Sequence, residues 1–306
     1  MQREPLVYLN GDFVPKSEAK ISVFDHGLLY GDGVFEGIRA FDGHVFKLKE
    51  HVDRLYQSAA CIELEIPMNR YQMVDAVTET LRRNNFRDAY IRLVVTRGVG
   101  DMGVNPRPCK EASVFVITEP VASSTFPKEP RVLSTIITFV RRDPVDSTTH
   151  EIKSLNYLNS VLAVLEANRA EVDYPVMLDH RGFVSEGSTM NIFLVRDGTV
   201  ITPPSSSGIL HGITRARVMK LCRDLKHQLV EREVTPFELF TADEAFFTGT
   251  LLGLAAIGEV SGKRIGSGGA GPVTRELYDE FREIVSRPEE GTPIFRTEKT
   301  KSVRKR

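Results

Sequence analysis

Apolar and polar positions follow two distinct rhythms along the first 120 residues of the chain. Alternating runs separated by Asn-Gly and Asp-Gly turns predict strands at 7–9, 13–14, 34–41 and 45–46. An apolar period of about 3.6 residues then predicts two helices, at 50–64 and 70–84. Alternation returns at 90–96 and 113–118, on either side of a loop rich in Gly and Pro. The pattern therefore predicts a small α+β domain over residues 1–121.

A stretch with linker composition, 122–128, precedes a second set of periodic segments. Strands are predicted at 131–140, 176–178, 191–195, 200–201 and 244–247, and helices at 156–168, 214–225 and 273–285. Helices and strands mix without a βαβ rhythm, which favours an α+β fold over a doubly wound sheet. Residues 129–286 are thus expected to form a larger second domain. The tail, 287–306, carries seven basic and three acidic residues and is expected to be disordered.

Composition narrows the class of function. Forty basic and 41 acidic residues leave a net charge of -1, so the chain has no global field for nucleic acid or an anionic membrane. No run approaches the roughly 20 apolar residues of a membrane span, and the start of the chain lacks the apolar core of a signal peptide. We therefore expect a cytoplasmic protein with small-molecule partners. Three distant cysteines without CxxC spacing favour neither a disulfide framework nor a metal site.

Lys153 is the first candidate for chemistry. It precedes the apolar helical segment by a few residues, and Tyr157 follows it four residues later. A lysine in such a setting can carry a carbonyl cofactor as a Schiff base, provided that its amine loses its proton. A single lysine near a helix start is more often simply solvated, so the hypothesis depends on whether other residues of the chain could bind the same cofactor.

Three further segments contain groups that could bind such a cofactor. The loop 208–215 runs into a helix, where the backbone N–H groups of Ile213 and Thr214 can bind an anion, although Thr214 as an ordinary N-cap is the simpler interpretation. Thr250 follows a strand in a Thr-Gly-Thr turn that exposes hydroxyls and amides. Glu186 is expected in a turn before the strand at 191–195, where its carboxylate can keep a pyridine nitrogen protonated, or can be an exposed loop acid.

The first domain contributes a fourth segment, Tyr-Gly-Asp-Gly-Val-Phe-Glu-Gly-Ile-Arg at 30–39. Its glycines permit a tight entry into a strand, and Tyr30, Phe35 and Arg39 are able to line a pocket. Arg54, on the helix that follows, is able to donate to a phosphate, whereas most helix arginines face water.

Taken in order, these blocks resemble the class IV pyridoxal-phosphate aminotransferases. The blocks are YGDGVFEGIR, EHVDRL around Arg54, AYIR at 89–92, KSLNYLNSVLA, GFVSEGSTMNIF, GITR and FFTGT. The resemblance spans 7–285 and implies the two-domain fold-type IV architecture, which is like that of D-amino acid aminotransferases. Such a fold has a small α+β N-terminal domain and a larger β-barrel-like C-terminal domain.

The resemblance implies a role for each matched residue. Lys153 would form the aldimine with pyridoxal 5'-phosphate and move the proton during ping-pong transamination. Tyr157 would bond the phenolic oxygen of the ring, and Glu186 would pair with the pyridine nitrogen. The residues that would hold the phosphate are Arg54, Ile213, Thr214 and Thr250.

Within the family, the blocks at 35–39 and 90–92 look like those of branched-chain enzymes that use 2-oxoglutarate, which implies a role in branched-chain amino acid biosynthesis. Tyr90, with the amides around Thr250 and Leu251, would bind the substrate α-carboxylate, and Tyr30 and Phe35 would wall an apolar pocket. Arg92 would accept a distal carboxylate. The loop at 98–106 resembles one that reaches a neighbouring subunit, which implies at least a homodimer.

Two departures from the family pattern leave the substrate open. Leu-Leu-Gly-Leu-Ala-Ala at 251–256 stands where branched-chain enzymes carry small residues followed by Glu. The Lys-Ser-Leu-Asn-Tyr spacing also occurs in relatives that act on D-amino acids and in lyases. A D-amino acid transaminase, an (R)-amine transaminase and an aminodeoxychorismate lyase are therefore kept as alternatives.

Overall fold

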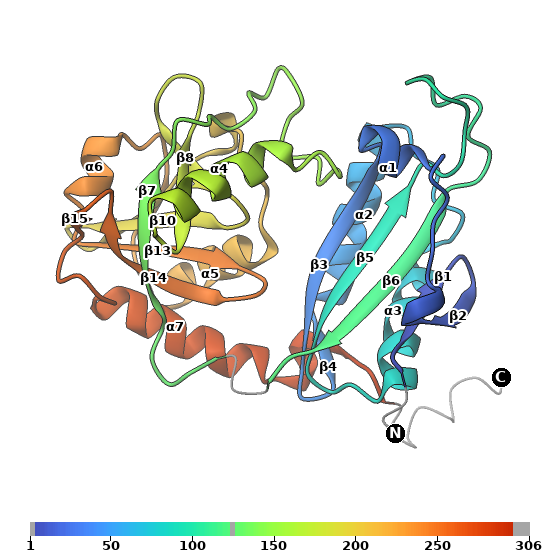
Figure 1. Ribbon diagram of the computed structural model, residues 1–306. Helices are drawn as coiled ribbons and strands as arrows, with labels where there is room; N and C mark the ends of the chain where they lie inside the picture. The colour runs from blue at the N-terminus through green and yellow to red at the C-terminus, as the bar shows by residue number, and fades with distance from the viewer. Residues whose placement is uncertain (1–3, 123–125, 296–306) are drawn as a thin grey trace. The chain divides into compact units, whose positions relative to one another are not determined.

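A computed structural model describes residues 4–122 and 126–295, and the chain divides into two compact units (Figure 1). The first unit comprises 1–123 and 285–306, and the second comprises 124–284. In the part of the chain that the structure describes, no helix is long and apolar enough to cross a membrane.

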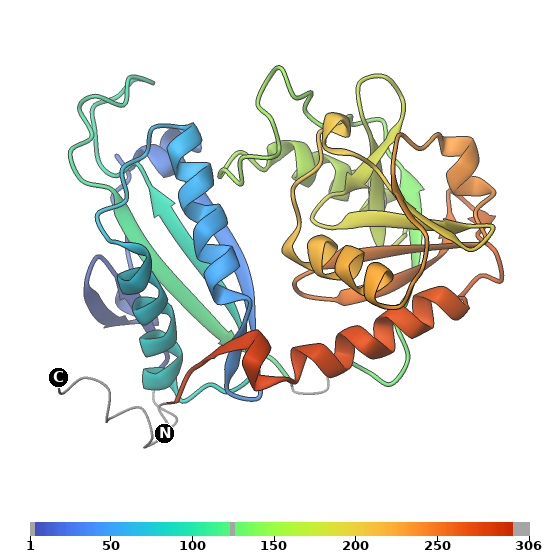
Figure 2. The same ribbon diagram turned by 180° about the vertical axis from the view of Figure 1, so that it is seen from behind.

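The first unit is built on a seven-stranded sheet with the order β16-β4-β3-β5-β6-β1-β2. Its strands are β1 (Leu6–Leu9), β2 (Asp12–Pro15), β3 (Gly33–Phe41), β4 (His44–Phe46), β5 (Ala89–Thr96), β6 (Ser113–Pro120) and β16 (Gly291–Pro293). Helices α2 (Leu48–Cys61) and α3 (Arg70–Asn84) cover one face of the sheet (Figure 2), and the short α1 (His26–Tyr30) precedes β3.

Alternation along β3 and β5 decides which side chains meet the helices. Ile38 lies opposite Ile91 in the antiparallel register, and both are buried in the core that includes Leu55 of α2 and Leu81 of α3. Because side chains alternate across a strand, Phe35, Gly37 and Arg39 fall on the opposite face. Helix α3 starts at a capping box made by Asn69 and Gln72, which explains why its predicted bounds are confirmed.

In the second unit, six strands close into a ring in the order β10-β13-β14-β7-β8-β9, because β9 pairs with β10 as well as with β8. They are β7 (Val132–Ile137), β8 (Tyr174–Leu178), β9 (Val184–Gly187), β10 (Asn191–Arg196), β13 (Glu244–Gly249) and β14 (Gly253–Val260). The short strands β11 (Thr199–Thr202), β12 (Leu229–Glu231) and β15 (Lys263–Arg264) extend the sheet. The side chains that fill this unit's core include Ile192, Leu194 and Phe247.

Four helices accompany the ring: α4 (Leu158–Arg169), α5 (Ile213–Asp224), α6 (Pro236–Phe240) and α7 (Pro272–Val285). Helix α4 connects β7 to the parallel strand β8, and α5 connects β11 to the parallel strand β12. The second unit thus contains two βαβ connections within a mixed sheet. The sequence did not predict this alternation of strands and helices, because the apolar runs are short. The start of α7 is fixed by Glu244, whose carboxylate accepts bonds from the backbone N–H groups of Val273 and Thr274.

Two expectations from the sequence are corrected. Glu186 does not lie in a turn but in strand β9, which is buried along its whole length. The tail is not disordered from residue 287: Pro288–Glu290 form a 3-10 helix and β16 pairs with β4. Ile294 explains this order, because it is fully buried in the core of the first unit. The rest of the tail, 296–306, and the centre of the linker, 123–125, lie outside the described residues.

Candidate active site

Lys153 and Tyr157 contact each other directly in the second unit. The ammonium Nζ of Lys153 donates to the phenolic oxygen of Tyr157 at 3.0 Å. Tyr157 is the N-cap residue of α4, so the start of this helix fixes the position of the phenol. Lys153 lies in the irregular segment just before it and is partly exposed. An amine and a phenol, both partly exposed, are thus held next to each other.

Glu186 is a buried carboxylate with bonds on both oxygens. Oε2 accepts from the Asn191 side chain at 2.8 Å and from the backbone N–H of Leu210 at 3.2 Å. Oε1 lies 3.2 Å from a guanidinium nitrogen of Arg142. Burial raises the pKa of Glu186 to about 7, against the opposing attraction of Arg142. The effect of burial therefore outweighs the attraction of the guanidinium, and a further cationic group beside the carboxyl would favour its ionised form.

Two residues around Glu186 were not anticipated from the sequence. His150 is buried, with Nε2 3.8 Å from Glu186 Oε1 and its ring 5.4 Å from that of Tyr157. Burial, together with the nearby Arg142 and Lys153, lowers the pKa of His150 well below its usual value, so this imidazole is neutral. Arg142 follows β7 and is fully buried. No periodic signal marks either residue, because both lie in the irregular segment between β7 and α4.

The start of α5 is adapted to bind an anion. Gly212 is its N-cap and no side chain caps the first turn, so Thr214 lies inside the helix and the N-cap interpretation of Thr214 is wrong. Ile213 and Thr214 therefore present backbone N–H groups at the positive end of the helix dipole. A pocket of about 320 Å³ opens there, lined by Ser205, His211, Gly212, Ile213, Arg215, Ala216 and Glu231.

Asn191 joins the carboxylate to this helix start. Its side chain donates to Glu186 and also to the carbonyl of Leu210, two residues before the N-cap of α5. Gly212 is required at that N-cap, since a Cβ there would lie 2.0 Å from the Asn191 side-chain oxygen. Asn191 also pairs with Thr248 of β13, two residues before Thr250. The fold thus gathers Glu186, the α5 start and the end of β13 around one amide.

Thr250 lies in the tight turn that connects β13 to β14. Strand β13 ends at Gly249, which pairs with Gly253 at the start of β14, so only 250–252 form the connection. Leu251 is exposed, whereas Leu254 is buried in β14. Of the unusual leucines, only Leu251 and Leu252 are therefore in the turn, and Leu254 belongs to the core.

The first unit places four predicted residues on the sheet face opposite α2 and α3. Phe35 and Arg39 of β3 share this face with Tyr90 and Arg92 of β5, because Arg39 pairs with Tyr90 and Gly37 with Arg92. The Arg92 guanidinium lies 4.3 Å from the centroid of the Phe35 ring. This cation–π contact fixes the direction of the Arg92 side chain, which is partly exposed.

Arg54 lies on the helix side of the same sheet. Its Nε and Nη2 each donate to a separate oxygen of the buried Glu36 at 2.7 Å, and His51 Nδ1 lies 2.7 Å from Glu36 Oε2. Burial alone would raise the pKa of Glu36, but the charges of Arg54 and His51 outweigh it and lower this pKa to about 2. The bidentate pair holds the guanidinium of Arg54 in one orientation.

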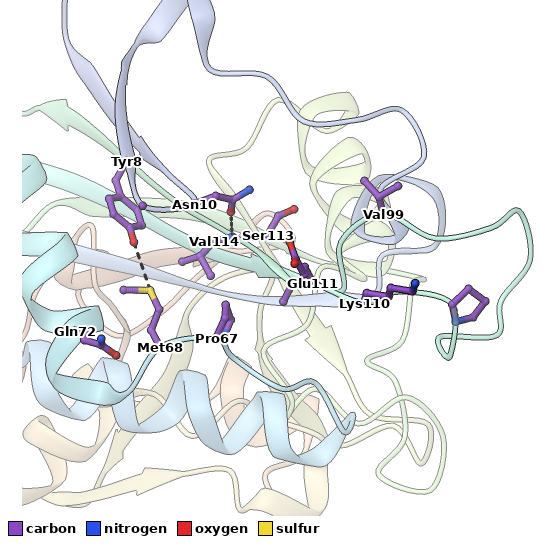
Figure 3. Close-up of a pocket in the computed structure, with 13 residues that line it drawn as sticks. Tyr8, Asn10, Pro67, Met68, Gln72, Val99, Lys110, Glu111, Ser113 and Val114 are labelled. Carbon is purple, nitrogen blue, oxygen red and sulfur yellow. Dashed lines mark hydrogen bonds between the residues drawn. The ribbon is translucent and has the colours of Figure 1, made fainter.

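Tyr30 ends the short helix α1, and its hydroxyl accepts the backbone N–H of Gly103 at 2.6 Å. It therefore holds the loop between β5 and β6. The same unit contains a larger cavity of about 850 Å³, in which Figure 3 shows Tyr8 directed toward the sulfur of Met68. None of the site residues predicted from the sequence lines this cavity.

Comparisons with known proteins identify the family of the chain. The family model for amino-transferase class IV matches residues 33–260. A Methanocaldococcus jannaschii protein provisionally named branched-chain-amino-acid aminotransferase is 51% identical over 91% of this chain and 96% of its own. The Escherichia coli K12 branched-chain-amino-acid aminotransferase is 34% identical over 90% of this chain and 91% of its own.

Solved structures give the same result. A branched-chain amino acid aminotransferase from T.th., complexed with N-(5'-phosphopyridoxyl)-L-glutamate, has a TM-score of 0.87 at 38% identity and covers 95% of this chain and 97% of its own. The Thermoproteus uzoniensis branched-chain aminotransferase with norvaline has a TM-score of 0.89 at 36% identity, with coverage of 96% and 100%. The predicted fold-type IV architecture is confirmed, and the chain belongs to the class IV aminotransferase family.

Proposed function

We propose that the protein is a pyridoxal-phosphate-dependent aminotransferase that exchanges the amino group between branched-chain L-amino acids and 2-oxoglutarate in a ping-pong reaction. One observation within the second unit supports this chemistry. Lys153 donates to Tyr157, and the buried Glu186 accepts a hydrogen bond from Leu210, just before the uncapped start of α5. The substrate class is supported by the names of relatives that match nearly the whole chain.

The residues present fit the cofactor. Pyridoxal phosphate supplies an aldehyde that takes up the amino group and a ring that withdraws electrons from the substrate Cα. Glu186 would hold a proton on the ring nitrogen, and Tyr157 would donate to the ring hydroxyl oxygen. Ile213 and Thr214 would bind the phosphate through their backbone N–H groups, with Thr250 and Arg54 as further donors. Lys153 would carry the proton removed from the substrate Cα.

Substrate recognition is assigned to the face of the first sheet that carries Phe35, Tyr90 and Arg92, and to the β13–β14 turn. Phe35 and Tyr30 would contact an apolar side chain, and Tyr90 with the amides near Leu251 would bind the α-carboxylate. Arg92 lies over Phe35, so one surface offers both an aromatic ring and a guanidinium. Such a surface suits a leucine side chain in one half-reaction and the distal carboxylate of glutamate in the other.

Half-reaction spectra test this proposal against its alternatives. The purified holoenzyme should be converted to its pyridoxamine form by L-leucine, L-valine and L-glutamate, with D-alanine and a chiral primary amine at least about tenfold slower. Conversion by the D-amino acid or the amine alone would assign the protein to one of the other transaminases. Pyruvate release from aminodeoxychorismate without a keto acid would assign it to the lyases.

Gly37→Ala is expected to weaken substrate binding without affecting the fold. A Cβ at residue 37 would lie 2.5 Å from the Tyr90 hydroxyl, which is the far end of a flexible side chain and is able to move aside. We expect KM for L-leucine to rise about tenfold with a melting temperature within about 2 °C of wild type. Gly269→Ala is the control, because a Cβ there meets nothing within 4 Å. An unchanged KM would show that Tyr90 does not bind substrate.

A homodimer and a cytoplasmic location belong to the same proposal. Four apolar side chains of α4, Leu158, Val161, Leu162 and Leu165, are all more than 40% exposed. Their spacing places them on one face of the helix, which a second copy of the chain would cover. Sedimentation of the purified protein measures this directly.

A further inference from the structure

Arg142 is a fully buried arginine that contacts both Glu186 and the beginning of α4. Its Nη2 lies 3.2 Å from Glu186 Oε1 and donates to the carbonyl of Gly187 at 2.6 Å. Its Nη1 donates to the side chains of Asn159 and Ser160, both at 3.2 Å. One guanidinium therefore links strand β9 to the first turn of the helix that follows Lys153 and Tyr157.

The charges around Glu186 make Arg142 its principal partner. His150 is neutral and too distant, at 3.8 Å, for a hydrogen bond. Arg142 attracts the carboxylate more strongly than Lys153 and Arg215 do, and the Asn191 side chain and the Leu210 amide are uncharged donors. A buried carboxylate without a direct cation would take up a proton. The ionised state of Glu186 thus depends chiefly on Arg142.

We propose that Arg142 is a positioning residue. It favours the ionised form of the Glu186 carboxylate against the effect of burial, directs the carboxylate toward the ring nitrogen of the cofactor and ties it to the Lys153–Tyr157 segment. The proposal rests on the proposed function, because it needs Glu186 to face that nitrogen. Arg142 itself contacts no reacting atom. Its contacts to Asn159 and Ser160 fix the position of the Glu186 carboxylate relative to the helix that follows Lys153.

The ionisation of Glu186 in the cofactor-free protein is the first test. In Arg142→Gln, the infrared band of a protonated carboxylic acid should be present at pH 8 and disappear in Arg142→Gln/Glu186→Gln. In wild type at pH 8, Glu186 should be mostly ionised. Arg142→Lys keeps the charge and should keep the carboxylate ionised. The exposed neighbour Arg141, changed to Gln, is the matched control and should behave as wild type.

Cofactor binding is the second test. The dissociation constant of pyridoxal phosphate should rise at least about tenfold at pH 7.5 in Arg142→Gln, and the deficit should shrink as pH rises and Glu186 ionises. Adding Arg142→Gln to Glu186→Gln should have little further effect, because both act through one carboxylate. If Arg142→Gln does not fold, Arg142→Lys still tests the proposal. In that variant Glu186 should stay ionised while the affinity for pyridoxal phosphate is weaker than in wild type.

The outcomes separate this inference from the proposed function. Full additivity of the two substitutions, or an ionised Glu186 with normal cofactor affinity in Arg142→Gln, would overturn the role of Arg142. In that case Glu186→Gln would still weaken cofactor binding. If Glu186→Gln and Lys153→Ala both bind pyridoxal phosphate as wild type does, the proposed function itself is wrong.

Discussion

Replacing Lys153 with alanine is expected to lower kcat by at least about 10⁴-fold. By our proposal, the substitution removes both the amine that would carry the cofactor and the base that would move the Cα proton, and proton transfer alone contributes about 10²–10⁴-fold. Noncovalent cofactor binding should survive in part, because Glu186, Tyr157 and the start of α5 remain. The loss should therefore appear in kcat far more than in the amount of cofactor bound.

Single-turnover absorbance with L-leucine and equilibrium dialysis of pyridoxal phosphate measure these two effects separately. Lys153→Arg keeps a positive charge beside Tyr157 but should be as inactive as the alanine variant, because a guanidinium does not lose its proton in proteins. Lys220→Ala, an exposed lysine of α5, is the control for loss of a surface amine. Near-normal turnover by Lys153→Ala would refute the assignment.

Replacing Glu36 with glutamine is expected to destabilise the protein by about 3 kcal/mol at pH 7. Glu36 is fully buried between Arg54 and His51, and its pKa is lowered from 4.5 to about 2. A difference of about 2.5 pKa units corresponds to about 3 kcal/mol, which agrees with the usual cost of breaking a buried ion pair.

The sign of the pH dependence follows from the lowered pKa. The ionised Glu36 contributes its full stability above its unfolded pKa, near 4.5, and loses it as pH falls toward 2. The difference between wild type and Glu36→Gln should therefore vanish near pH 2. Urea unfolding of the cofactor-free protein at pH 7, 4 and 2 measures this, with the exposed Glu65→Gln as control. A difference that persists at pH 2 would show that packing, not charge, is lost.

The sequence predicted the elements with strong periodicity or clear end signals. Helix α3 has an apolar face and a capping box, and the Asp42-Gly43 hairpin has a turn dipeptide, so local chemistry alone defines them. Strand β9 and the strand that begins at Gly253 were missed, because fully buried strands lack alternation. The tail strand β16 was missed for another reason: its order comes from distant contacts, such as those of Ile294.

The residue types of the chain thus determined by themselves which chemistry is present: an amine at Lys153, a carboxylate at Glu186 and amides at a helix start. Only the tertiary structure decided the state of these groups. Burial raises the pKa of Glu186 to about 7. Arg142 reaches Glu186 because β8 pairs with β7, which Arg142 follows, and also with β9, which holds Glu186. The physical reason is that ionisation depends on solvent exclusion and on charges from segments far apart in the chain, which local sequence patterns do not record.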